Sequence, residues 1–145
     1  MAINTQKVLV GGLAAGVVMN IIDFVNNKFI LGARMMAEAE AFKPGMTASM
    51  NTTSVMVSYI AMDLILGIAL VWTYAAIRPR FGPGLKTASY AAFLFWVLAG
   101  TFYSGYLHMG MTSTGLWWSL AIVGLVNFLL SAWVGAKLYT EGAAI

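Results

Sequence analysis

The sequence contains no cysteine, and only 9% of its residues are charged. The absence of cysteine excludes disulfides, thiolate metal ligands and a cysteine nucleophile. A soluble domain usually has about 25% charged residues, so this chain has too little charge to cover a surface in water. Its net charge of +3 comes from few residues. A dense basic patch is therefore missing, and we expect no nucleic-acid partner.

What the chain has instead is a hydrophobic fraction of 61%, gathered in four long runs. These cover residues 8–31, 53–77, 87–107 and 116–139. Each reaches the ~20 residues that a membrane-spanning helix needs. The first run is too long for a signal peptide and contains Asn20 and Asp23. We predict one domain over residues 1–145, an all-α membrane protein built as an antiparallel four-helix transmembrane bundle.

The positively charged residues favour one orientation of this bundle. Both termini would share a side with Lys7, Arg78, Arg80, Lys86 and Lys137, opposite Lys28, Arg34 and Lys43. Because cytoplasmic loops carry the excess of Lys and Arg, we expect both termini in the cytoplasm. The segment RPRFGPG, residues 78–84, is expected to form a rigid turn, since its prolines and glycines cannot continue a helix.

The loop between the first two runs is the only long one. Its segment ARMMAEAEAF places Met35, Ala39 and Phe42 on one helical face, with Glu38 at the edge. We expect a short amphipathic helix on the outer membrane surface, ended by the Pro-Gly pair that follows. A solvated loop is the alternative.

Each run also has one helical face of small and polar residues. At ~100° per residue, these faces comprise Gly12, Gly16, Asn20, Asp23 and Asn27; Thr52, Met56, Tyr59, Asp63, Gly67 and Tyr74; Ser89, Phe93, Trp96, Gly100 and Ser104; and Gly124, Asn127, Ser131 and Gly135. Small residues let helices approach closely in lipid. The predicted helix-packing positions are Gly12, Gly16, Gly67, Gly100, Gly124 and Gly135. By the same spacing, Asn26 falls outside the first face.

The polar residues converge at one depth. A rise of ~1.5 Å per residue places Asp23, Asp63 and Asn127 ~12–16 Å from the outer helix ends. We predict a buried polar level formed by Asn20, Asp23, Asn27, Tyr59, Asp63, Ser104 and Asn127. No lysine or arginine shares this depth, so the aspartates need hydrogen bonds, water or protons. We expect at least one of the two carboxyls to be protonated at neutral pH.

Three roles are open for the polar level. Interhelical hydrogen bonds could hold the bundle together, or intramembrane carboxyls could mark a proton, ion or solute path. The third role is a metal or cofactor site, but His108 is the single histidine and lies shallower than the aspartates. It could provide one ligand to a pigment or metal. The sequence requires no cofactor and has no ExxH pair, phosphate-binding loop or HExxH motif, so we expect no enzyme and no metal site.

Two segments, GGLAAGVVMNIIDFVNNKFILG at residues 11–32 and LVWTYAAIRPRFGPGLKTA at residues 70–88, carry a resemblance. They are similar to an uncharacterised group of small bacterial proteins with four transmembrane helices, over residues 11–88. The resemblance implies the four-helix architecture and a bacterial inner membrane. It supplies no function and no site residue.

Size, glycine faces and aromatic outer faces favour a non-catalytic role. We expect an accessory or assembly subunit that packs in the lipid bilayer against another membrane protein or a second copy, for example in a respiratory or photosynthetic complex. The alternative is a small oligomeric carrier or proton-coupled channel that uses Asp23 and Asp63.

Overall fold

The computed structural model describes residues 3–141, which form helices and connecting turns and contain no strand. The helices are α1 (Thr5–Val25), the π-helical turn η1 (Asn26–Ile30), α2 (Gly32–Phe42), α3 (Met46–Met50), α4 (Thr53–Phe81), α5 (Leu85–His108) and α6 (Thr114–Leu138). Within this part of the chain, four helical segments are long and apolar enough to cross a membrane: Thr5–Ile30, Thr53–Phe81, Leu85–His108 and Thr114–Leu138. The predicted all-α bundle with four spans is confirmed.

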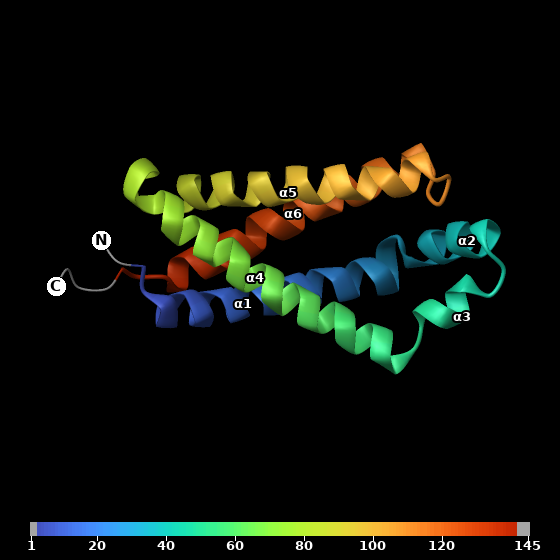
Figure 1. The fold of residues 1–145 in the computed structure, drawn as a ribbon, viewed down its shortest axis with the longest axis horizontal. Helices are drawn as coiled ribbons and strands as arrows, with labels where there is room; N and C mark the ends of the chain where they lie inside the picture. The colour runs from blue at the N-terminus through green and yellow to red at the C-terminus, as the bar shows by residue number, and fades with distance from the viewer. Residues whose placement is uncertain (1–2, 142–145) are drawn as a thin grey trace.

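The four long helices follow the long axis of the molecule, with α4 crossing α1 and α5 lying beside α6 (Figure 1). The start of α1, the α4–α5 turn and the end of α6 share one end, which we call the inner end. The α2 and α3 helices and the α5–α6 turn lie at the opposite, outer end. At the inner end, the backbone N–H of Asn4 donates to the hydroxyl of Tyr139 at 3.3 Å. The cytoplasmic position of the inner end stays a prediction.

The closest helix contact joins α1 to α4 through glycines. Gly12, Gly16 and Gly67 are all buried. A Cβ atom on Gly12 would lie 2.5 Å from the Cα of Ile68, and one on Gly16 would lie 2.6 Å from the Cα of Leu64. A Cβ on Gly67 would overlap the backbone of Gly12 and Gly16. The two helices therefore touch backbone to backbone, as small residues permit.

The α1–α6 contact uses a second glycine pair, one member of which the sequence did not single out. Gly135 lies against Gly11, so that a Cβ on Gly11 would be 2.7 Å from the Gly135 carbonyl oxygen. The packing role predicted for Gly100 is not seen within the described chain, whereas Gly124 lies in van der Waals contact with a side chain of α5. In the described chain nothing lies within 4 Å of a Cβ built on Gly100, and at Gly124 the nearest atom, from Trp96, is 3.9 Å away. Here α5 and α6 stand apart and leave a hollow.

The turn expected over residues 78–84 is shorter than predicted, because α4 continues to Phe81 with Pro79 inside its last turn. A proline there removes one backbone hydrogen bond, at a helix end where few others depend on it. The chain turns at Gly82 and Gly84, whose φ angles of 83° and 118° suit glycine. The hydroxyl of Thr87 donates to the Gly82 carbonyl at 2.7 Å and holds the turn.

The expected outer helix is present as α2, and it is fastened to the start of α6. The Glu38 carboxylate accepts from the backbone N–H and the hydroxyl of Ser113, each at 2.7 Å. Arg34 donates to both Glu38 and Ser113, at 3.3 and 3.1 Å. Burial raises the pKa of Glu38, but the hydrogen bonds from Ser113 and Arg34 outweigh it, so this pKa lies below its ordinary value. A carboxylate at a helix N-terminus is also favoured by the helix dipole. That α2 lies on the membrane surface stays a prediction.

Candidate functional site

Side-chain hydrogen bonds join α1 to the adjacent helix α6 and continue along α6 as a polar chain. The Asn127 amide nitrogen donates to Asp23 Oδ1 at 2.8 Å, and the Ser131 hydroxyl donates to Asn127 Oδ1 at 3.2 Å. Asn127 and Ser131 are buried, and Asp23 is half-buried. The predicted meeting of Asp23 and Asn127 at one depth is what the structure shows. Such a network fixes the register of α1 against α6.

Asn20 lies one turn closer to the inner end and connects α1 to α4. Its side-chain amide donates to the Gly16 carbonyl of its own helix at 3.0 Å and to the Ile60 carbonyl of α4 at 3.4 Å. Asn20 therefore satisfies backbone acceptors, and it does not hydrogen-bond to either aspartate in the described structure.

The interior position predicted for Asn27 belongs to its neighbour Asn26. Asn27 is exposed and donates to the backbone carbonyl of Asp23 at 2.8 Å, whereas Asn26 is only 5% exposed. The cause is η1, where the N–H of Leu31 bonds five residues back to Asn26 at 2.9 Å. A π-helical turn contains more residues than an α-helical turn. It therefore changes which residues face inward, and a constant 100° spacing assigns the wrong asparagine.

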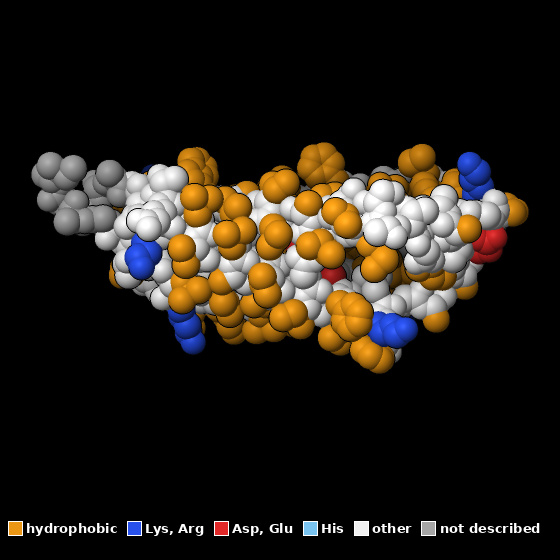
Figure 2. Space-filling view, turned by 90° about the horizontal axis from the view of Figure 1, so that it is seen from below, with side chains coloured by type: hydrophobic (Ala, Val, Ile, Leu, Met, Phe, Trp, Pro, Cys, Tyr) orange, Lys and Arg blue, Asp and Glu red, His pale blue; other side chains and the backbone are white. Residues whose placement is uncertain are grey.

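Asp63 has no hydrogen bond to its carboxyl among residues 3–141. It is half-buried on α4, with its backbone carbonyl against Gly16 of α1. On the face seen in Figure 2, acidic atoms appear in a recess partway along the molecule, and one lysine or arginine side chain lies between this recess and the outer end. The second aspartate therefore lies at the α1–α4 contact and is not joined to the polar chain.

Tyr59 and Ser104 lie outside the polar level, which corrects the prediction. Tyr59 is 53% exposed, and the Ser104 hydroxyl donates to the Thr101 carbonyl of its own helix at 2.7 Å. The prediction treated the four helices as evenly packed along their length. In the structure the outer half of α4 diverges from α5 (Figure 1), so side chains facing that gap do not meet.

His108 is exposed at the end of α5. Within residues 3–141, no group of three or more His, Asp and Glu residues could hold a metal ion. The aspartates and His108 therefore do not gather into one ligand set in the part of the chain that the structure describes.

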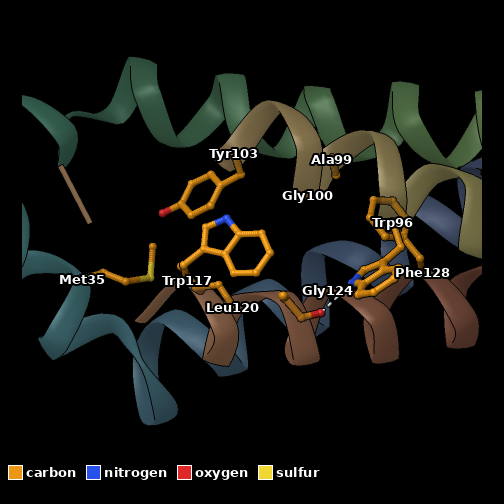
Figure 3. Close-up of a pocket in the computed structure, with 10 residues that line it drawn as sticks. Met35, Trp96, Ala99, Gly100, Tyr103, Trp117, Leu120, Gly124 and Phe128 are labelled. Atoms are coloured by element: carbon orange, nitrogen blue, oxygen red, sulfur yellow. Dashed lines mark hydrogen bonds between the residues drawn. The ribbon is translucent and has the colours of Figure 1, made fainter. Parts of the chain in front are cut away.

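The sequence reasoning missed a hollow between α5 and α6, shown in Figure 3. Its volume is about 250 Å³. It is lined by Met35, Trp96, Ala99, Gly100, Tyr103, Trp117, Leu120, Ala121, Gly124 and Phe128. The sequence contains a signal for this hollow. Gly100 and Gly124 have no side chain to fill the space between the helices, and the bulky aromatic residues around them hold the two helices apart.

Comparison with known proteins gives no family for this chain. No protein-family model, no curated protein and no solved structure matches it.

Proposed function

We propose that this protein is a non-catalytic membrane subunit that packs against another membrane protein or a second copy of itself. The observation that carries the proposal is Asp63, an aspartate inside a span whose carboxyl has no hydrogen-bond donor among residues 3–141. Burying a polar group without a partner is costly in a bilayer, because lipid supplies no hydrogen bonds.

Two donors of the neighbouring helices are already used. The Asn127 amide donates to Asp23, and the Asn20 amide donates to backbone carbonyls. A donor for Asp63 supplied by an adjacent membrane helix would remove the cost and fix the position of that helix. Polar residues act in this way between membrane helices, at about 0.6–2 kcal/mol each.

The surface around Asp63 suits such a contact. The outer half of α4 diverges from α5 and presents Tyr59, Ile60 and Met62, each at least half exposed. These side chains offer aromatic and flexible apolar groups, and methionine adapts well to a partner surface. A partner helix seated there would cover both the apolar side chains and the carboxyl beneath them.

The wider setting is also part of the proposal. Four apolar spans support a multi-pass membrane protein. The resemblance to small bacterial membrane proteins supports a bacterial inner membrane, and the distribution of Lys and Arg supports cytoplasmic termini. A respiratory or photosynthetic complex is the proposed kind of assembly.

The absence of cysteine makes a direct test available, since single-cysteine variants need no background mutations. A benzophenone label is placed at Met62→Cys, beside Asp63, and at Leu98→Cys on α5 as the control; these side chains are 53% and 48% exposed. On illumination of native membranes we expect a discrete protein adduct at Met62→Cys, lost with Asp63→Leu and retained with Asp63→Asn. A chain that purifies as a lone monomer in mild detergent, with no adduct at either site, contradicts the proposal.

A second candidate is the small carrier or proton-coupled channel. The presence of Asp23 and Asp63 within two spans that contact each other favours it, since intramembrane carboxyls occur on proton and ion paths. Neither aspartate lines either of the two cavities described in the bundle. Proton or ion flux into liposomes that is absent from both Asp63→Asn and Asp23→Asn proteins would support the carrier. Equal flux in all three proteins would exclude this role for the aspartates.

A further inference from the structure

The hollow between α5 and α6 is elongated along the helices. Its α6 wall runs from Trp117 to Phe128 through residues three or four apart, which covers ~16 Å at 1.5 Å per residue. Its α5 wall runs from Trp96 to Tyr103, and Met35 of α2 lies at the outer end. The shape is that of a groove between two helices.

The groove has polar groups at one end only. Figure 3 shows Tyr103 and Trp117 together near Met35, whereas Trp96 and Phe128 lie at the opposite end. The indole N–H of Trp96 donates to the Ala121 carbonyl at 2.7 Å and is therefore satisfied. The rest of the lining is apolar. An occupant matched to this groove has an apolar body and a polar group at its outer end.

The indole nitrogen of Trp117 supplies the second observation. It is buried and has no hydrogen-bond partner in the described chain, and in Figure 3 it lies on the side of the ring toward Tyr103. Buried donors are normally paired, so an unpaired one points to an acceptor outside the protein.

The depth of Trp117 identifies the kind of acceptor. The 25 residues of α6 span ~37 Å, against ~30 Å for a hydrocarbon core, so a centred helix extends ~4 Å beyond the core at each end. Trp117 lies three residues after the start of α6, ~4.5 Å along the axis. Its N–H is therefore at the boundary between hydrocarbon and headgroups, where tryptophan is common and where lipid ester carbonyls lie.

We propose that the α5–α6 groove binds one acyl chain of an ester-linked phospholipid from the outer leaflet, with the ester carbonyl accepting a hydrogen bond from Trp117 Nε1. The volume is sufficient, because an apolar cavity of ~150 Å³ already admits benzene and this one measures about 250 Å³. Gly100 and Gly124 are the residues that keep the groove open. The site is independent of the partner contact at Asp63.

The test measures the indole N–H resonance of Trp117 by NMR, in micelles of an alkyl maltoside, which has no carbonyl group. The resonance is assigned as the one lost in Trp117→Phe. Two phospholipids with the same headgroup and chain length are titrated, one ester-linked and one ether-linked. The ester lipid should shift the resonance saturably, and the ether lipid should bind about five-fold more weakly, as expected for one net hydrogen bond.

Two variants of α5 show whether binding occurs in the groove. Gly100 and Gly105 both have open space at the Cβ position, but only Gly100 lines the groove. Gly100→Leu should abolish the saturable shift, and Gly105→Leu should leave it unchanged, with equal helix content by circular dichroism. Equal shifts with ester and ether lipids would overturn the hydrogen bond, and a saturable shift in Gly100→Leu would overturn the site.

Discussion

Replacing Gly16 with alanine tests the backbone contact between α1 and α4. The added Cβ would lie 2.6 Å from the Cα of Leu64 and 2.8 Å from the carbonyl oxygen of Asp63. Carbon atoms pack best at ~3.5–4.0 Å, so the helices must separate by ~1 Å near this point. The clashing atoms are backbone, which cannot rotate away as a side chain would.

The cost arises because this separation loosens the packing of α1 against α4 on both sides of Gly16. A gap of ~0.5–1 Å already removes a quarter to a half of the van der Waals attraction between two atoms. Overpacking of this kind costs ~1–3 kcal/mol. In lipid this cost is not offset by a hydrophobic gain, because lipid tails are as apolar as the helices.

Gly100→Ala is the matched control, since nothing in the described chain lies within 4 Å of its Cβ position. Both variants gain the helix propensity of alanine over glycine, up to ~1 kcal/mol. The difference between them therefore isolates the clash. Unfolding in dodecyl sulfate mixed micelles, followed by circular dichroism, should show Gly16→Ala less stable than Gly100→Ala by ~1–3 kcal/mol. A difference below ~0.5 kcal/mol would refute the reasoning, since that is the size of an ordinary surface substitution.

Three further predictions concern the outer end, the polar chain and the inner turn. Because the folded pKa of Glu38 lies below its ordinary value of 4.5, its contribution to stability is present above pH 4.5 and is lost as the pH falls through the folded pKa. The protection of the Ser113 amide against hydrogen exchange, taken relative to the intrinsic exchange rate at each pH, should therefore fall below pH 4.5, and Glu38→Gln should remove most of this pH dependence. Asn127→Leu should destabilise the bundle by ~1–3 kcal/mol because it leaves the Asp23 carboxyl unpaired. Asp23→Asn keeps an acceptor for the Asn127 amide and should cost less than ~1 kcal/mol. Equal losses of stability in micelle unfolding would contradict the hydrogen-bond assignment. Gly82→Ala places a side chain at a φ of 83° and should cost ~1–2 kcal/mol, measured in the same assay, and an unchanged midpoint would show that the turn adjusts.

The spans and the glycine contact of α1 with α4 could be predicted from the sequence, because hydropathy and helical spacing are local properties. Gly12, Gly16 and Asp23 follow a regular α-helix, and the structure places them on its packed side. The prediction fails at Asn27 because η1 changes the number of residues per turn. The Asn27 side chain also donates to the backbone carbonyl of Asp23, where it competes with the backbone hydrogen bonds of the helix. Helical spacing alone does not predict this bond.

Features that depend on the separation of helices were harder to predict. The wrong assignments have two causes: Gly100 lies at the hollow between α5 and α6, and Tyr59 lies where the outer half of α4 diverges from α5. Glu38 was placed at the edge of an amphipathic helix, and its bonds to Ser113 join residues 75 positions apart. The sequence shows that Glu38 can accept hydrogen bonds, but only the folded structure shows that its donor is Ser113 at the start of α6.

The contact between Gly16 and Leu64 also has a consequence for biogenesis. It joins α1 and α4, which leave the ribosome before α5 and α6, and its surfaces need nothing from those later helices. Synthesis at ~5–20 residues per second leaves seconds between the second span and the last, and small elements close in microseconds to milliseconds. The α1–α4 hairpin can therefore pair in the membrane while the rest of the chain is still being translated, and later spans would insert against a helical pair that is already assembled.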